Sequence, residues 1–544
     1  MTTQVDLKSQ IANGLPEAKR QYPLDEKLIR LSRKGDWLRL RDFVRNFGVS
    51  GSIGSGKTTG PIHVLQRSAW AAGHCGLILC AKPDSAAQAI ELAKHAGREK
   101  DIVHIYPGSG YCINPIKVMM SMADEMGFGI PLDEALDEVW TMIEILNRGE
   151  VAQQGDNFFL PAQRELIHKV MKVLWASTRD IDIREVVKCC RFAPDDLEKW
   201  SDPKKNPILG HLQNIKSRGG WNHEIAELED YFVQLALLAD KTRSSIQISA
   251  TVRLAPMLDE PIYSLCFKSP TNITPKEIAD RGLLVVLDYP YAQYRGSARA
   301  LGATLKSLCQ KFCMNRPDND EQVPFGIWAD EAACWLTQMD IEATERGRSA
   351  RMYHCFSWQA DSTLTNGYGG GSVGESRAAA LRANLIVQII CGQVDYPTRK
   401  NRQDAAGLTK QWMKQLTPQP QGEDRISHSE QYLPALPEEW MLGLENGFRG
   451  FVEAFVFKGD LCKWNKQKRM LVRWYRPLGK GWFFWSPIFE RHATARPWAC
   501  SVSWRDFWRL LNRHGLRRAC LAWADFRVFS MVRPNFNRNR RSHV

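Results

Sequence analysis

The sequence predicts an α/β fold with a mostly parallel central sheet, and three observations support this. Short apolar runs alternate with helical patterns between residues 47 and 106, a glycine-rich octapeptide follows the first run, and the alternation resumes near residue 282. Alternating strands and helices form parallel sheets because each connection crosses back over the sheet. The chain of 544 residues is also too long for one hydrophobic core, which predicts several domains.

The glycine-rich octapeptide Gly51–Thr58 has the pattern G-x-x-x-x-G-K-[ST] of a phosphate-binding loop. In this pattern, backbone N–H groups surround the phosphates, the lysine adds a positive charge and the last hydroxyl can bind Mg²⁺. A helix expected from Thr59 to Ala72 would direct its positive N-terminal end at the same anion. The alternative is a glycine-rich turn without nucleotide. The expected ligands are ATP and Mg²⁺, and the predicted nucleotide-binding residues are Gly51, Ser52, Ile53, Gly54, Ser55, Gly56, Lys57, Thr58 and Thr59.

Continuous apolar runs predict the remaining strands, because strands of a parallel sheet are buried on both faces. After the first strand, Phe47–Ser50, the expected strands are Gly76–Ala81, Asp101–Tyr106, Gly282–Asp288, Pro324–Glu331, Arg351–Gln359 and Leu385–Ile390. Helices are expected over Ser85–Ala96, Ser297–Asn315 and Ser376–Asn384, with a glycine-rich loop over Asn366–Glu375. Residues 395–460 close the domain with helices and a last β pair.

The stretch from Lys117 to Leu258 has apolar residues at helical spacing and few strand-like runs, which predicts an all-α insertion. Its expected helices are Asp133–Asn147, Leu160–Ser177, Pro194–Trp200, Glu224–Leu238 and Ser244–Leu254. Such a lobe can be a platform for a substrate or partner, or simply a cover over the sheet. The predicted organisation is an N-terminal arm (1–35), a P-loop NTPase domain in two parts (36–116 and 259–462), the all-α inserted domain (117–258) and a C-terminal tail (463–544).

Two acids at the end of an apolar strand suggest the catalytic centre. Asp330 would hold the Mg²⁺ shell together with Thr58, and Glu331 would act as general base on the attacking water. Gln359 ends the next strand, where a neutral amide can sense the γ-phosphate or position the water. The alternatives are a helix N-cap for the two acids and a surface position for Gln359.

Three arginines, Arg346, Arg348 and Arg351, lie between these two strands. An arginine delivered by a neighbouring subunit can stabilise the charge of the transition state and accelerates hydrolysis by about 10³–10⁵-fold. We favour Arg348 for this role, although spacing alone does not orient a side chain. The alternative is that all three form a solvated face.

The basic character of the chain is concentrated in the C-terminal tail, which interleaves arginine with tryptophan. Residues 463–544 contain 19 Lys and Arg residues against three acidic ones, in a chain with a net charge of +13. Arginine and aromatic side chains together can bind single-stranded DNA, and they also suit an anionic membrane surface. The third interpretation is a small folded module with tryptophans in its core. The tryptophans are Trp464, Trp474, Trp482, Trp485, Trp498, Trp504, Trp508 and Trp523.

The sequence has no signal-peptide pattern at Met1 and no run of eighteen apolar residues, so we expect the protein to be made and kept in the cytosol. Fourteen cysteines without a C-x-x-C pair do not suggest a disulfide framework or a zinc site. Cys189 and Cys190 are the only adjacent pair and receive no role.

The order of these motifs resembles the TraG/TraD-like type IV coupling proteins, conjugative DNA-transfer ATPases related to the HerA/FtsK translocases. The pieces that carry the resemblance are Gly51–Thr58, Lys82, Asn114-Pro115, Asp156–Phe159, Lys241–Ile246, Leu284–Asp288, Asp330-Glu331, Gly347–Ser349, Gln359, Asn384 and Asp395–Thr398. The phosphate-binding loop alone is not specific, whereas all the pieces in one order around a helical insertion are much more so.

The resemblance implies a RecA-like P-loop motor domain that assembles into a homo-hexamer with nucleotide at the subunit interfaces. It implies Lys57 and Thr58 for phosphate and Mg²⁺, Asp330 and Glu331 as Walker B acids, Gln359 as sensor and Arg348 as the finger acting in trans. It also implies pumping of single-stranded DNA with its relaxase towards channel proteins of a type IV secretion system. An alternative is a nucleotide-regulated recruitment protein with slow, DNA-independent ATP turnover.

The sequence departs from the family at three places. Family members usually carry N-terminal transmembrane helices, and none is predicted here. The strand before Lys82 ends in Cys80-Ala81, where an acid is common in the family. The tail after about Lys463 matches no part of the family. Peripheral contact of this tail with the cytoplasmic face of the inner membrane is one hypothesis for how the chain reaches a secretion channel.

Overall fold

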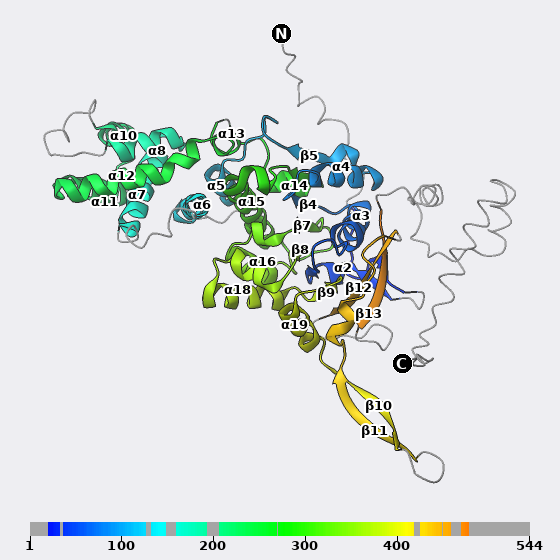
Figure 1. Ribbon diagram of the computed structural model, residues 1–544. Helices are drawn as coiled ribbons and strands as arrows, with labels where there is room; N and C mark the ends of the chain where they lie inside the picture. Colours follow the sequence, from blue (N-terminus) through cyan, green and yellow to red (C-terminus); the bar gives the residue numbers. More distant parts are fainter. Residues whose placement is uncertain are drawn as a thin grey trace. The chain divides into compact units, whose positions relative to one another are not determined.

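The computed structural model describes residues 20–32, 36–126, 132–147, 159–192, 206–268, 270–417, 425–448, 450–458 and 469–477. Its centre is a nine-stranded sheet in which seven strands, from β9 to β5, run parallel (Figure 1). β12 and β13 extend one edge in antiparallel pairing. The strand order is β13 (Arg469–Tyr475), β12 (Phe451–Lys458), β9 (Val387–Ile390), β3 (Phe47–Ser50), β8 (Met352–Trp358), β7 (Phe325–Ala329), β4 (Cys75–Leu79), β6 (Leu284–Leu287) and β5 (Ile102–Ile105).

Side chains alternate between the two faces of this sheet, and each face has its own hydrophobic core. In β7, Phe325 and Ile327 belong to one core and Trp328 belongs to the other. The core that contains Trp328 is covered by α3 (His63–Ala71) and α4 (Ser85–His95). The opposite core is covered by helices that include α15 (Tyr291–Met314). The predicted α/β class with a parallel central sheet is therefore confirmed.

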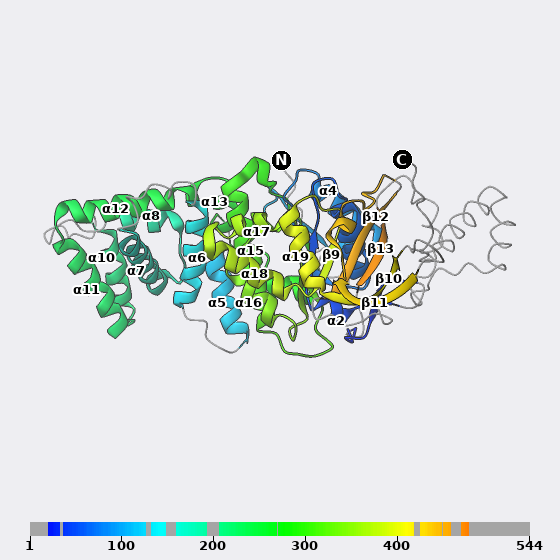
Figure 2. The same ribbon diagram turned by 60° about the horizontal axis from the view of Figure 1, so that its bottom comes forward.

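Every described element between β5 and β6 is helical, as the sequence pattern predicts (Figure 2). The predicted helix Pro194–Trp200 lies outside the described residues. The helices are α5 (Pro115–Met126), α6 (Leu132–Leu146), α7 (Leu160–Thr178), α8 (Ile183–Arg191), α10 (Pro207–Ser217), α11 (His223–Leu237), α12 (Asp240–Leu254), a 3₁₀ turn (Ala255–Leu258), α13 (Ile262–Cys266) and α14 (Pro275–Asp280).

The helical stretch is joined to the sheet layer through contacts of α6 with α15. Glu138 of α6 accepts a hydrogen bond from the Ser307 hydroxyl at 2.9 Å and forms an ion pair with Lys311 at 3.0 Å. Glu138 and Ser307 are buried, so this polar contact lies inside the interface rather than at its rim. A hydrogen-bonded carboxylate in such a place fixes the register of the two helices.

The structure differs from the prediction in the glycine-rich segment over Asn366–Glu375. We expected a loop there, but α17 (Asp361–Gly367) and α18 (Gly371–Asn384) take up most of it. Only residues 368–370 connect the two helices, and Gly369 and Gly370 adopt positive φ angles of 99° and 76°. Glycines supply the sharp connection between the helices, and helix formation continues on both sides of it.

Both ends of the described chain add short strands. β1 (Lys27–Arg30) and β2 (Trp37–Arg39) form a small antiparallel sheet before the turn of α2 (Leu40–Phe43), whereas residues 1–19 of the predicted arm are outside the described residues. β13 falls within the predicted tail, where its Trp474 is buried against the sheet. The other tryptophans of that tail lie outside the described residues.

α16 (Met339–Arg346) lies between β7 and β8 in the chain, and α19 (Tyr396–Ala406) follows β9. After α19, the chain forms a long antiparallel hairpin that projects from the sheet domain (Figure 1). Its strands are β10 (Leu408–Thr417) and β11 (Arg425–Pro434). Among the helices that the structure describes, none combines the length and the apolar character needed to cross a membrane.

A buried ion pair stabilises the packing of α15 against α16. Lys306 donates to Asp340 at 2.5 Å and to the Trp335 carbonyl at 2.6 Å, and both side chains of the pair are fully buried. Burial lowers the pKa of Lys306, and the Asp340 carboxylate opposes this shift. Asp340 also accepts from Gln310 at 2.8 Å, so its remaining oxygen is satisfied.

We predict that Asp340→Asn destabilises the protein strongly, because it leaves the Lys306 ammonium buried without a carboxylate. The expected loss of unfolding free energy is about 3–5 kcal/mol. Urea unfolding of the purified chain measures it. The double variant Lys306→Met/Asp340→Asn removes both charges and is the matched control, which we expect to recover a large part of the loss. Equal losses in the single and double variants would contradict this account.

Candidate nucleotide-binding site

The glycine-rich loop Gly51–Thr58 leaves the carboxyl end of β3, which lies between β9 and β8, at the edge where α/β sheets bind ligands. A π-helical turn over Thr58–Ile62 then leads into α3, which confirms a helix after the loop. Gly54 and Gly56 have φ angles of 72° and 82°. A Cβ on Gly56 would lie 2.5 Å from Val452 Cγ2 of β12, so this glycine also permits close packing.

Lys57 is folded back over the loop that precedes it. Its ammonium donates to the carbonyl of Gly51 at 2.5 Å and to that of Ser52 at 3.0 Å. Burial lowers the pKa of Lys57, and the nearby Asp330 carboxylate opposes the shift. The ammonium is therefore held at the concave side of the loop, where a phosphate-binding loop places its charge.

Asp330 follows β7 and meets the loop through two hydroxyl groups. Thr58 Oγ1 donates to Asp330 Oδ2 at 2.7 Å, and Ser357 Oγ of β8 donates to Asp330 Oδ1 at 2.5 Å. Burial raises the pKa of Asp330. The Lys82 ammonium and the two hydroxyl donors outweigh it and hold the pKa below its usual value. The site thus contains a carboxylate with a lowered pKa beside the loop hydroxyl.

Glu331 adopts a left-handed backbone conformation, with φ 59° and ψ 57°. Strained backbone of this kind in a non-glycine residue is concentrated at functional sites. The Glu331 carboxylate forms an ion pair with Lys82 at 3.1 Å, and Lys82 also lies 3.6 Å from Asp330. Burial lowers the pKa of Lys82, but the two carboxylates raise it above its usual value.

Gln359 follows β8 at the same edge of the sheet, and its backbone is tied to the loop by Gln393. The buried Gln393 amide donates to the Gln359 carbonyl at 2.7 Å and accepts from the Ser52 hydroxyl at 2.8 Å. Gln393 follows β9, so three neighbouring strand ends are joined by one side chain. The Gln359 backbone is thereby tied to the phosphate loop through one side chain.

The three candidate arginines lie at the opposite end of β8 from the phosphate loop. Arg351 is buried and forms an ion pair with Asp320 at 2.5 Å, so its positive charge is neutralised within the fold. Arg346 and Arg348 are exposed. The seven residues of β8 separate Arg346 and Arg348 from the carboxyl end of this strand, near the phosphate loop, by roughly 20 Å at about 3.3 Å per residue. Arg348 therefore does not reach the loop of its own chain.

Sequence reasoning missed Lys82, Ser357 and Gln393 as site residues. Each lies at or just beyond the end of an expected strand, so a usable signal existed in the strand pattern. What the sequence did not reveal is that β9, β3, β8, β7 and β4 are neighbours in this order. The carboxyl ends of parallel strands meet at one edge, and spatial order decides which of them face the phosphate loop.

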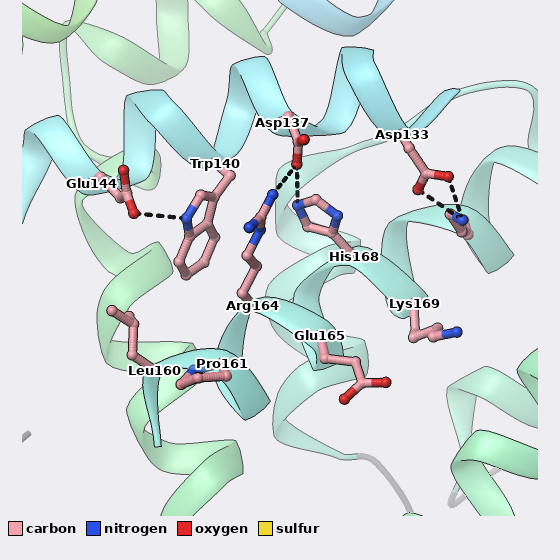
Figure 3. A pocket seen from close by; sticks show the side chains of 11 residues that line it. Asp133, Asp137, Trp140, Glu144, Leu160, Pro161, Arg164, Glu165, His168 and Lys169 are labelled. Carbon is pink, nitrogen blue, oxygen red and sulfur yellow. Dashed lines mark hydrogen bonds and ion pairs between the residues drawn. The ribbon is translucent and has the colours of Figure 1, made fainter. Parts of the chain in front are cut away.

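The helical lobe contains a separate open groove of about 600 Å³ between α6 and α7 (Figure 3). Several of its charged side chains pair across the two helices, and Figure 3 shows Arg164 directed at Asp137. The Arg164 and Asp137 side chains are 2.5 Å apart. The Trp140 indole donates to Glu144 at 2.9 Å. This groove contains no equivalent of the phosphate loop.

No family model matches the chain, and no curated protein matches it. Its fold, however, is similar to solved structures of the bacterial conjugative coupling protein TrwB. The unbound monoclinic form has a TM-score of 0.54 at 13% identity, over 85% of this chain and 92% of that one. The TrwB complex with ADP and Mg²⁺ has a TM-score of 0.53 at 13% identity, over 84% and 90%.

At this level of identity the similarity establishes the fold. The chain therefore shares the fold of the coupling protein TrwB, in agreement with the fold that the motif resemblance implies. TrwB has also been solved with the non-hydrolysable ATP analogue ADPNP, with a TM-score of 0.53 at 13% identity over 84% of this chain and 91% of that chain.

We predict that Gly56→Ala weakens nucleotide binding and destabilises the protein more than Gly54→Ala does. Both substitutions place a Cβ on left-handed backbone, at about 1–2 kcal/mol each. Only the Cβ at Gly56 also collides with Val452, whereas the one at Gly54 meets nothing within 4 Å. Thermal unfolding and the affinity for a fluorescent ADP analogue measure the difference. Equal effects of the two variants would contradict the packing argument.

Proposed function

We propose that this chain is an ATP-driven DNA translocase of the coupling-protein type, which recruits a DNA–relaxase substrate and moves it into a type IV secretion channel. One observation carries the proposal. The hydroxyl of the phosphate loop and a strand-end carboxylate, Thr58 and Asp330, meet at 2.7 Å although 272 positions separate them in the sequence. This arrangement on the coupling-protein fold supports binding and hydrolysis of a nucleoside triphosphate.

The residues around Asp330 fit the binding of Mg²⁺ with ATP. Hard cations prefer oxygen ligands, and Thr58 and Asp330 would hold the ion while the Ser357 hydroxyl orients the carboxylate. When bound, Mg²⁺ neutralises negative charge on the phosphate oxygens. The Lys57 ammonium and the N–H groups of the loop would bind the β- and γ-phosphates. The TrwB complexes with ADP and Mg²⁺ and with ADPNP support this assignment by similarity of fold.

Glu331 would act as the general base for hydrolysis. It accepts a proton from the attacking water while the water oxygen bonds to the γ-phosphorus and the bond to the β–γ bridging oxygen breaks. Its Oε1 forms an ion pair with Lys82 at 3.1 Å, so one of the two carboxylate oxygens is occupied by the ammonium in this conformation. Gln359 would sense the γ-phosphate, because the Gln393 contact couples its position to the loop.

Arg348 would complete the site of a neighbouring subunit. Its distance from the loop of its own chain and its exposed side chain both support delivery in trans. Head-to-tail contacts of this kind generate closed rings, and we propose a homo-hexamer with nucleotide at each interface. Loops that face the channel of the ring would then move single-stranded DNA.

The basic C-terminal tail would provide a binding surface for one of the proposed partners. We propose that the arginines and tryptophans of this tail that follow β13 bind single-stranded DNA, and peripheral contact with the cytoplasmic face of the inner membrane is the alternative use of the same composition. Relaxase and secretion-channel proteins are the further proposed partners.

One observation favours a second function, a nucleotide-regulated recruitment protein with slow turnover that is independent of DNA. In this conformation of the chain, the proposed general base Glu331 forms an ion pair with Lys82. If nothing displaces that ion pair, nucleotide binds but is hydrolysed slowly. Stimulation by DNA separates the two functions.

We predict that purified protein hydrolyses ATP and that single-stranded DNA stimulates the rate several-fold. Lys57→Ala should abolish nucleotide binding, and Glu331→Gln should retain binding while the rate falls by about 10²–10⁴-fold, since a general base is lost. Phosphate release with and without DNA measures the rates. Asp288→Asn is the matched control, because Asp288 follows β6 and pairs with His104 away from the loop. Hydrolysis that does not respond to DNA would overturn the motor function in favour of recruitment.

A second prediction tests delivery of Arg348 in trans. Lys57→Ala and Arg348→Ala should each be inactive alone, and mixing them should restore hydrolysis at up to about a quarter of the sites in a randomly assembled ring. Only interfaces that combine an intact Lys57 with an intact Arg348 from different subunits are competent. Arg346→Ala, which removes the exposed neighbour, is the control and should remain active. A mixture as inactive as its components would contradict the proposal.

A further inference from the structure

Outside the nucleotide site, the helical stretch brings three side chains with different metal-binding atoms together. Glu185 and Cys189 are one helical turn apart on α8, and His211 reaches them from α10. Their carboxylate oxygen, sulfur and imidazole nitrogen atoms all lie within 4.8 Å of one another. We propose that these residues bind a divalent transition-metal ion of the zinc type, which links α8 to α10.

The separation between the carboxylate and the imidazole matches that of a tetrahedral site before any ion is bound, and the sulfur lies within 4.8 Å of both. Bonds of about 2.0–2.2 Å from zinc to nitrogen and oxygen place neighbouring ligand atoms roughly 3.4 Å apart. Glu185 Oε1 and His211 Nε2 lie 3.5 Å apart, which is long for a hydrogen bond and suits two ligands of one ion. The helices therefore need little movement to accept the metal.

The second nitrogen of the histidine has the partner that a metal-binding imidazole requires. His211 Nδ1 lies 3.1 Å from Ser177 Oγ of α7, and that hydroxyl oxygen also accepts from Asn214 at 2.9 Å. With Nδ1–H donated to Ser177, Nε2 is unprotonated and faces Glu185. Such outer contacts fix the tautomer and the ring orientation of metal-bound histidines.

The donor set selects the class of ion. Thiolate and imidazole ligands favour zinc, cobalt and similar ions, whereas magnesium and calcium prefer sites made of oxygen alone. Cys189 is fully buried, and the Glu185 and His211 side chains are 31% and 19% exposed, so one side of the cluster remains open to an entering ion and a water ligand. The ion would replace Lys188, whose ammonium lies 3.0 Å from Glu185 Oε1.

Sequence analysis predicts no zinc site because no C-x-x-C pair is present. The cluster takes one cysteine, one histidine and one carboxylate from two helices, and that spacing is not distinctive in a sequence. The adjacent Cys190 is also fully buried and is not part of the cluster. It therefore provides a matched control for Cys189.

The test uses the full chain, freed of metal with a chelator and titrated with Co²⁺ in the presence of excess Mg²⁺. We expect stoichiometric binding with a thiolate-to-cobalt charge-transfer band, competition by Zn²⁺ and a higher melting temperature of the metal-bound protein. Absence of this band in the wild-type protein at stoichiometric Co²⁺ would overturn the proposal without recourse to any variant.

Variants locate the site. Cys189→Ser should abolish the band, whereas Cys190→Ser should retain it. Ser177→Ala should weaken Co²⁺ binding by about tenfold through loss of the outer contact. Lys188→Ala should tighten binding, because it removes the competing ammonium. A band that survives Cys189→Ser unchanged, or that is lost equally in Cys190→Ser, would place the metal elsewhere and contradict the assignment.

Discussion

The contact between Thr58 and Asp330 is the interaction on which the functional site depends. It joins the loop after β3 to the end of β7, two strands that are separated in the sheet by β8. Ser357 of β8 bridges that gap, because its hydroxyl donates to the same carboxylate at 2.5 Å. The parallel arrangement makes this possible, since it brings the carboxyl ends of all three strands to one edge.

The charges of the site follow from the same arrangement. Burial alone would raise the pKa of the Asp330 carboxyl. The neighbouring ammonium of Lys82 and two hydroxyl donors reverse that tendency and keep the pKa of Asp330 low. Lys82 also forms an ion pair with Glu331. One ammonium therefore stabilises the charge of the proposed metal ligand Asp330 and pairs with the proposed general base.

Much of this fold was predictable because its signals are local. The phosphate loop, the buried strands and the helical stretch each have a pattern within a short window, and Asp330 and Glu331 could be placed because they end such a strand. Lys82 and Gln393 follow expected strands, but their roles depend on which strands are neighbours, and the sequence does not show that order. The cluster around Cys189 was missed because its residues come from two helices whose packing the sequence does not show. The segment over Asn366–Glu375 was misjudged because its glycines suggested a loop, whereas only residues 368–370 connect two helices.

The most direct test of the central claim is the Mg²⁺ dependence of ADP affinity in Asp330→Asn, measured by fluorescence against the wild-type protein. If Thr58 and Asp330 together hold the ion, Mg²⁺ should tighten ADP binding to the wild-type chain and should have little effect on the variant, at unchanged folding by circular dichroism. If Mg²⁺ strengthens ADP binding equally in both proteins, the carboxylate beside the loop is not part of the metal site and the account is wrong.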